Sequence, residues 1–134
     1  MTNAAMMKAA VFHRYGPPQR LSLREVPVPR PAPGEILVRV RATTVNRTDT
    51  ATLRAHPFFA RPMTGLLRPR MQTLGMDSAG IVDGLGDGVT AFQPDDRVFG
   101  LLPEKFGAHA EYLCLPADGA PFHRTLRRLR FELP

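Results

Sequence analysis

The clearest alternation of apolar and polar residues lies in residues 35–45. Because successive side chains of a strand point to opposite faces, this segment predicts a β-strand with one buried face. A similar alternation occupies residues 7–12, and residues 21–26 follow it after a Gly-Pro-Pro turn. These two segments predict an antiparallel pair. The buried face of the strand at 35–45 is expected to contain Ile36, Val38, Val40 and Ala42.

Residues 74–100 are rich in glycine and carry the short apolar pairs Ile81–Val82 and Val98–Phe99. Glycine adopts positive φ without a steric clash, so this composition predicts tight bends between short strands of a small twisted or barrel-like sheet. Gly84-Leu-Gly-Asp-Gly88 lacks the following helix that a dinucleotide-binding loop requires. Ser78 lies one residue too far from Gly75 for a nucleophile elbow. Turns are therefore the favoured interpretation of both motifs.

A strand-to-helix junction is predicted after residue 45. Asn46 or Thr48 could cap a short helix that runs to about Arg54. Residues 55–73 then predict a long basic loop without acidic residues, placed as a lid over a substrate or a cofactor phosphate. Phe58 and Phe59 could line an apolar pocket there, or pack over the sheet.

Another strand is predicted over residues 108–116, with Tyr112 packed in the sheet and Cys114 as a small buried residue. The length of 134 residues fits one domain, and the 43% of hydrophobic residues is ordinary for a globular protein. No apolar run approaches the roughly 20 residues of a membrane helix, and no signal-peptide pattern begins the chain. The single cysteine is typical of a cytoplasmic protein, and neither a membrane nor a disulfide is expected.

The formal net charge is +6, and the basic residues gather most densely in the last segment of the chain. A solvated basic tail is favoured over a nucleic-acid site, because no nucleic-acid-binding motif accompanies the charge. The four histidines show no metal-ligand spacing, so no metal site is expected. The arginines of the tail are Arg124, Arg127, Arg128 and Arg130.

Four motifs carry a resemblance to a known family: Gly-x-Glu/Asp, Ala-Gly-x-Val, Gly-x-x-Val-x-x-Phe and Gly-Asp-x-Val. The sequence resembles the N-terminal GroES-like domain of the medium-chain dehydrogenase/reductase superfamily. Asp95 departs from the pattern where the family has glycine, but aspartate tolerates left-handed geometry better than most residues. The motifs lie at Gly75–Asp77, Ala79–Val82, Gly86–Phe92 and Asp96–Val98.

The resemblance implies a mainly β fold with short helices, in the form of a partly open barrel. This GroES-like domain would occupy residues 7–120, after an N-terminal extension at 1–6 and before an off-pattern basic tail at 121–134. The barrel would be incomplete relative to the full family domain, because the resemblance ends at about Ala120.

The resemblance also bears on the chemistry. Zinc-dependent members carry a cysteine ligand where this chain has Asn46 and a histidine ligand where it has Met76. Neither an amide nor a thioether is a competent zinc ligand in such a site, so no zinc is expected. The chain resembles the zinc-independent quinone oxidoreductase type, in which the hydride of NADPH passes to a quinone or an enone.

In that type Asn46 would hydrogen-bond the developing oxyanion, although capping a helix explains the residue equally well and both roles are compatible. Asp49 would order the same turn or pair with an arginine. Phe58, Phe59 and Met76 are the candidate substrate-binding residues.

No dinucleotide fingerprint occurs in the sequence. We therefore expect a truncated form of a larger reductase, with weak or no activity alone and poor binding of NADPH. An uncovered sheet edge would favour self-association or binding to a full-length relative. The alternative is a standalone GroES-like module that binds or regulates without catalysis. A nucleic-acid binder that acts through the tail ranks third.

Overall fold

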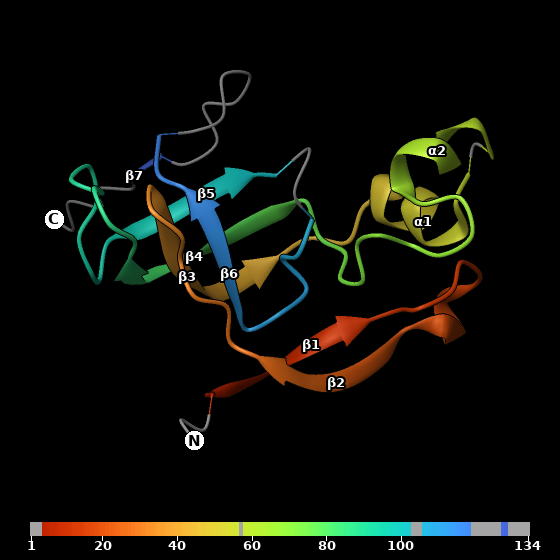
Figure 1. Ribbon diagram of the computed structural model, residues 1–134, viewed down its shortest axis with the longest axis horizontal. Helices are drawn as coiled ribbons and strands as arrows, with labels where there is room; N and C mark the ends of the chain where they lie inside the picture. The colour runs from red at the N-terminus through yellow and green to blue at the C-terminus, as the bar shows by residue number, and fades with distance from the viewer. Residues whose placement is uncertain (1–3, 57, 103–105, 119–126, 129–134) are drawn as a thin grey trace, which may run out of the picture.

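The chain forms two open antiparallel sheets with one short helical region at their edge (Figure 1). The computed structural model describes residues 4–56, 58–102, 106–118 and 127–128. The smaller sheet is a hairpin in which β1 (Met6–Val11) pairs with β2 (Ser22–Pro27) through a turn that contains the 3-10 helix η1 (Pro18–Arg20). This confirms the antiparallel pair that the alternation predicts.

The larger sheet has the strand order β6-β3-β4-β5-β7, and every neighbouring pair is antiparallel. The described strands leave both sheets open, which confirms a mainly β fold without a closed barrel. The strands are β3 (Glu35–Thr43), β4 (Asp77–Leu85), β5 (Arg97–Leu101), β6 (Tyr112–Pro116) and β7 (Arg127–Arg128).

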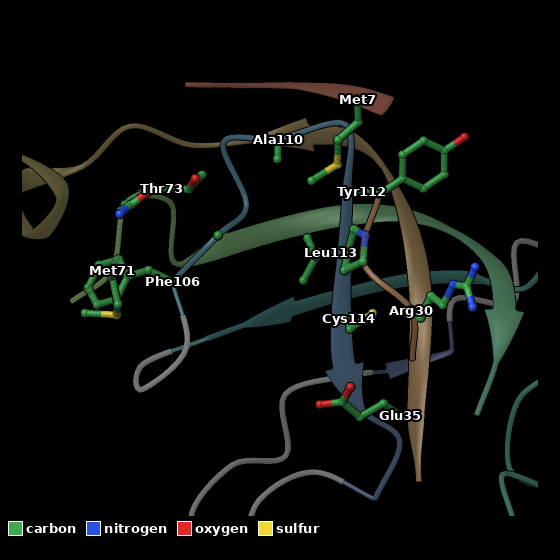
Figure 2. Close-up of a pocket in the computed structure, with 13 residues that line it drawn as sticks. Met7, Arg30, Glu35, Met71, Thr73, Phe106, Ala110, Tyr112, Leu113 and Cys114 are labelled. Atoms are coloured by element: carbon green, nitrogen blue, oxygen red, sulfur yellow. The ribbon is translucent and has the colours of Figure 1, made fainter. Parts of the chain in front are cut away.

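The two sheets meet where β1 approaches the start of β6. Ala9 and Ala110 form an isolated bridge, and the backbone N–H of Glu111 donates to the carbonyl oxygen of Lys8. Next to this contact lies a cavity of about 450 Å³ (Figure 2). Its walls come from both sheets and from the segment before β6, with apolar side chains such as Met7, Phe106 and Leu113.

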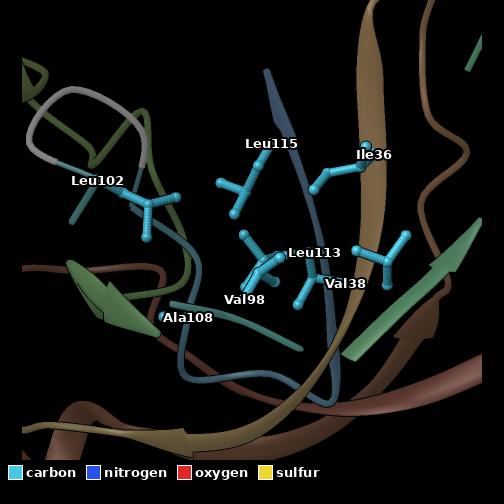
Figure 3. Close-up of a cluster of buried hydrophobic side chains, with 8 residues drawn as sticks. Ile36, Val38, Val98, Leu102, Ala108, Leu113 and Leu115 are labelled. Atoms are coloured by element: carbon cyan, nitrogen blue, oxygen red, sulfur yellow. The ribbon is translucent and has the colours of Figure 1, made fainter. Parts of the chain in front are cut away.

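A cluster of apolar side chains from β3, β4, β5 and β6 forms the main core (Figure 3). Ile36 and Val38 expose no surface, as the alternation in residues 35–45 predicts. Val40 is only half-buried and Ala42 is exposed, so that prediction is wrong at the end of the strand. The register of β3 against β4 shifts between Val40 and Ala42, and such a bulge turns the following side chains outward. The cluster consists of Ile36, Val38, Val82, Val98, Leu102, Ala108, Leu113 and Leu115.

A second, smaller cluster holds the helical region against the hairpin. Phe12 follows β1, Leu53 belongs to the helix α1 (Arg47–Arg54), and Leu74 precedes β4. All three side chains are at most 3% exposed. The cluster therefore joins three distant parts of the sequence: the residue after β1, the last turn of α1 and the segment before β4.

The glycine-rich segment combines turns with close strand contacts. Gly88 has a φ of +79° and Asp95 a φ of +72°, so Asp95 adopts a left-handed conformation, which aspartate tolerates better than most residues. Ser78 and Gly80 lie inside β4, however, so the turn prediction is wrong for them. A Cβ on Gly80 would lie 2.3 Å from the carbonyl oxygen of Arg39, and glycine is needed there for close strand approach.

The segment predicted as a loop over residues 55–73 contains short helical turns, η2 (Phe58–Ala60) and α2 (Arg61–Thr64). Pro62 lies in the first turn of α2, where backbone N–H groups have no acceptor within the helix. Its lack of an N–H therefore removes no helical hydrogen bond. The strand predicted from residue 108 begins only at Tyr112. Tyr112 is half-buried and Cys114 is buried, as expected.

Within the part of the chain that the structure describes, no helix has the length and apolar character needed to cross a bilayer. The tail at 121–134 falls outside the described residues except for Arg127–Arg128, whose backbone pairs with Val98 and Phe99 of β5.

Candidate functional site

The junction between β3 and α1 is fixed by a capping box. The side-chain Oδ1 of Asn46 accepts hydrogen bonds from the backbone N–H of Thr48 (2.9 Å) and of Asp49 (3.3 Å). In return, Oδ2 of Asp49 accepts the backbone N–H of Asn46 at 2.9 Å. This reciprocal pair satisfies donors that the first helical turn leaves without partners. Asn46, rather than Thr48, is therefore the cap.

Asp77, the first residue of β4, organises the side chains that face it from the junction. Its Oδ2 accepts a hydrogen bond from the hydroxyl of Thr44 and a longer one, 3.4 Å, from Nδ2 of Asn46. The hydroxyl of Thr43 donates to the backbone carbonyl of Asp77 at 2.7 Å. The amide of Asn46 is thus oriented from two sides, by the helix cap at its oxygen and by Asp77 at its nitrogen.

Asp49 is only 2% exposed and does not face solvent. Besides its bond to Asn46, it accepts the backbone N–H of Gly75 at 2.9 Å through Oδ1. Hydrogen bonds to an ionised carboxylate are stronger than those between neutral groups. Of the two roles predicted for Asp49, the structure shows the ordering of the turn. It ties the start of α1 to the segment before β4.

His109 also belongs to this junction, although its position in the sequence gives no sign of it. Its Nε2 lies 2.9 Å from the carbonyl oxygen of Thr44, and its backbone N–H donates to Leu74. Gly75, with a φ of +101°, makes room for it, because a Cβ there would lie 2.7 Å from Cδ2 of His109. The three segments at Thr44, Gly75 and His109 therefore pack as one unit.

The five candidate residues do not form a single group. Asn46 and Asp49 share the capping box, and Met76 is a half-buried residue between Gly75 and Asp77. Phe58 and Phe59 lie on η2, past the end of α1, and are 68% and 81% exposed. None of the five lines the cavity between the sheets (Figure 2). That cavity instead includes Thr73 and Ala110, which adjoin the junction in sequence.

Sequence reasoning missed three residues of the junction: Thr44, Asp77 and His109. Asp77 carried a signal, because it completes the Gly-x-Glu/Asp motif immediately before a strand. Thr44 lies two residues before Asn46, near the end of the strand predicted over residues 35–45. The contact of His109 could not be predicted from a local sequence pattern, because His109 and Thr44 are 65 residues apart in the chain.

The junction offers hydrogen-bonding groups rather than a metal-ligand set. Its side chains are an amide, a hydroxyl, carboxylates and one imidazole, and the imidazole is engaged with a backbone carbonyl. Among the described residues no three His, Cys, Asp or Glu side chains gather where they could hold a metal ion. The chemistry that these groups support is the orientation and stabilisation of an oxygen atom on a bound molecule.

The glycine-rich segment from Gly84 to Gly88 does not form the loop that holds the pyrophosphate of a dinucleotide. The segment from Gly84 to Gly88 ends β4 and continues as a turn, with no helix after it. A Cβ on Gly86 would clash with the carbonyl oxygen of Ala32, so this glycine serves a close backbone contact. The interpretation of this motif as a turn is confirmed.

Comparison with known proteins identifies the family to which this fold belongs. The family model of the alcohol dehydrogenase GroES-like domain matches residues 32–122. The quinone oxidoreductase of Rattus norvegicus is 34% identical over 123 residues, which cover 90% of this chain and 34% of that protein. The structure of the quinone oxidoreductase from Coxiella burnetii superposes with a TM-score of 0.80 at 30% identity, over 97% of this chain and 39% of that one.

A third similar protein is the Escherichia coli quinone oxidoreductase, whose structure was solved in complex with NADPH. It has a TM-score of 0.71 and 27% identity, over 92% of this chain and 33% of that chain. The present chain thus spans about a third of the length of the relatives that it matches. By its family match and these relatives, the chain belongs to the medium-chain dehydrogenase/reductase superfamily, as an alcohol dehydrogenase GroES-like domain of the quinone oxidoreductase type.

Proposed function

We propose that this chain forms the substrate side of an NADPH-dependent, zinc-independent reductase that acts on quinones or enones. The observation that carries the proposal is the fixed amide of Asn46. Its oxygen is occupied by the cap of α1, and one N–H of its nitrogen is directed at Asp77. An amide nitrogen carries two N–H groups, so the second one can donate to the carbonyl oxygen of a substrate.

The chemistry of such a reduction explains why this donor matters. Addition of a hydride to a quinone or an enone leaves negative charge on the substrate oxygen. A donor that is already oriented stabilises this charge without reorganisation, and loss of one such donor lowers the rate by about 10²- to 10³-fold in known enzymes. Asp77 and the capping box supply the orientation of Asn46.

The assignment of NADPH rests on the relatives, whereas the assignment of zinc independence rests on residues of this chain. NADPH rests on the family, including the Escherichia coli relative solved with it, since the segment from Gly84 to Gly88 is a turn and not a dinucleotide-binding loop. The proposal therefore assigns only the substrate end of the reaction to this chain. Zinc independence rests on the chemistry of Asn46 and Met76, which are poor zinc ligands. The buried thiol of Cys114 fits a reducing compartment such as the cytoplasm.

A second candidate function is a standalone binding or regulatory module. The cavity of about 450 Å³ between the sheets favours it, because this volume lies in the range of small-molecule sites. The cavity lies beside β6 and does not include Asn46, so ligands of the two sites can be told apart.

The test follows the amide of Asn46 by NMR while the ¹⁵N-labelled chain is titrated with 1,4-naphthoquinone or 2-cyclohexenone. We expect the side-chain amide signals of Asn46 to shift with the probe. The variant Asn46→Ser keeps a good helix cap but removes the amide donor, and should weaken binding. The exposed Thr50→Ala change on the same helix is the control and should have no effect.

Two outcomes would contradict the proposal. If Asn46→Ser binds the probes as tightly as the unaltered chain, Asn46 does not contact the substrate. If the probes shift the signals of Ala110 and Leu113 and leave those of Asn46 in place, the ligand occupies the cavity, and the binding module becomes the better description.

A further inference from the structure

The segment that follows α1 presents apolar side chains to solvent. Phe58, Phe59, Leu66 and Leu67 are between 65% and 89% exposed. Single exposed apolar residues are common, but four large ones within ten residues of sequence are unusual, and concentrated exposed apolar area often marks a binding site. In Figure 1 the helical turns of this segment project from one end of the sheets.

The same segment is positively charged. No aspartate or glutamate occurs in residues 50–76, whereas Arg54, Arg61, Arg68 and Arg70 do. Arg54, Arg68 and Arg70 are exposed. We call the surface of this segment that carries Phe58, Phe59, Arg61, Leu66, Leu67 and Arg68 the basic apolar surface.

Arg61 is held at the base of this surface by aromatic rings. Its guanidinium carbon lies 4.2 Å from the ring centre of Phe58 and 5.5 Å from that of Tyr15. Tyr15 is itself anchored, because its hydroxyl donates to the carbonyl oxygen of Gly65 at 2.8 Å. The Nε of Arg61 is buried and has no hydrogen-bond partner among the described residues. This buried Nε is closed to solvent, so the guanidinium would attract an anion through its positive charge, which the two rings hold at this place.

We propose that the basic apolar surface binds an amphipathic anion, which is a molecule with an apolar chain or ring and one carboxylate or phosphate group. Arginine suits both anions, because its planar fork of N–H donors matches their oxygen atoms. The apolar part would cover the phenylalanine and leucine side chains and remove them from water. Because the surface combines positive charge with apolar side chains, we expect a ligand that has both an anionic group and an apolar part.

This inference deepens the proposed function, because it names the charge of the substrate. The surface begins where α1 ends, and Asn46 caps the start of α1. A helix of eight residues is about 12 Å long, so one molecule of moderate size can reach both ends. The inference rests on the proposed function only in identifying the bound anion with the substrate at Asn46. Binding of an anion to the surface can be measured without any reduction.

The test compares three probes by calorimetry on the same chain: octyl phosphate, the uncharged octyl glucoside and inorganic phosphate. We expect octyl phosphate to bind at least about tenfold more tightly than either of the others. Arg61→Gln should weaken the binding of octyl phosphate about tenfold. Arg24→Gln, at an exposed arginine of the hairpin strand β2, is the matched control and should leave the affinity unchanged.

Arg61→Gln also removes two ring contacts, so two exposed positions provide further variants. Arg68→Gln and Phe59→Ser should keep the thermal unfolding curve of the unaltered chain and still weaken octyl phosphate binding. Equal affinity for inorganic phosphate, or for octyl glucoside, would overturn the proposal. So would binding to phosphatidylglycerol vesicles without binding to octyl phosphate, since that result indicates a membrane surface.

The two proposals fail in different ways. If octyl phosphate does not bind but 1,4-naphthoquinone still shifts the amide of Asn46, the anion site is wrong and the proposed function stands. If octyl phosphate binds and Asn46 does not respond to the quinone or to the enone, the surface binds anions and the substrate role of Asn46 is wrong.

Discussion

The large sheet and the helical segment over residues 46–70 place their large apolar residues in opposite environments. In the sheet, Ile36 and Val38 are fully buried, and the cluster around them draws on four strands. In the helical segment, Leu53 is buried, but Phe59 and Leu67 are more than 80% exposed. The sheet is stabilised by its own packing. The helical segment is held by polar bonds and one small cluster, and its remaining apolar surface faces outward.

The largest effect should come from truncating the core of the sheet. Ile36→Ala removes a side chain with no exposed surface, and such changes cost about 2–5 kcal/mol through lost burial and the remaining cavity. The matched change Leu67→Ala, at a side chain 89% exposed, should alter stability by less than about 0.5 kcal/mol. Urea denaturation monitored by circular dichroism measures both. A similar cost for both variants would show that Leu67 packs in the folded chain, and the contrast between the regions would be lost.

The sheet was largely predictable from the sequence, because its signals are local. The alternation in residues 35–45 predicts β3, and the apolar pairs between glycines predict β4 and β5. The outward turn of Ala42 was not predictable, since a bulge depends on the register between two strands. The same holds for Gly80, whose role is a close contact with Arg39 of another strand.

The site was predictable only in part. The sequence predicts a helix cap at Asn46 or Thr48, and it predicts that Asp49 orders the same turn or pairs with an arginine. The structure selects Asn46 as the cap and Asp49 as its capping-box partner. Asp49 also bonds to Gly75, and Thr44 to Asp77, across 26 and 33 residues, and no local pattern contains such pairs. The family motifs mark Gly75 and Asp77 but do not state which groups they meet. Long-range hydrogen bonds are therefore the part that requires the structure.

The polar bonds of the helical segment can be broken at Asp49. Asp49→Asn places an amide where a buried carboxylate accepts two backbone N–H groups, so one N–H loses its acceptor. An unsatisfied buried donor costs about 1–3 kcal/mol. We expect urea denaturation to show a loss of this size, together with shifted amide signals at Gly75 and Asn46. Asp87→Asn, at an exposed carboxylate, is the control. A loss no larger than that of the control would mean that the capping box survives without the charge.

The role of Asn46 as a cap can be separated from its role as a donor by stability alone. Asn46→Ala removes the cap and should cost about 1 kcal/mol, whereas Asn46→Ser should cost only a few tenths, because serine is an equally good cap. Thermal unfolding of both variants gives the comparison. Equal destabilisation would show that the bond from Nδ2 to Asp77 stabilises the junction more than the cap does, and the serine variant would then be a poor probe of substrate binding.

The smallest expected effect is a gain in stability at the end of α1. Ala55 has a φ of +51° and a ψ of +47°, a left-handed conformation that costs a residue with a Cβ roughly 1–2 kcal/mol. Ala55→Gly relieves this strain but loses a buried methyl group and adds backbone freedom to the unfolded chain, so we expect a net gain of about 0.5 kcal/mol. Ala51→Gly, inside the same helix, should instead cost about 1 kcal/mol. If Ala55→Gly is as destabilising as Ala51→Gly, the methyl group of Ala55 contributes more through its packing than its conformation costs, and the helical segment is better packed at this end than its exposed phenylalanines indicate.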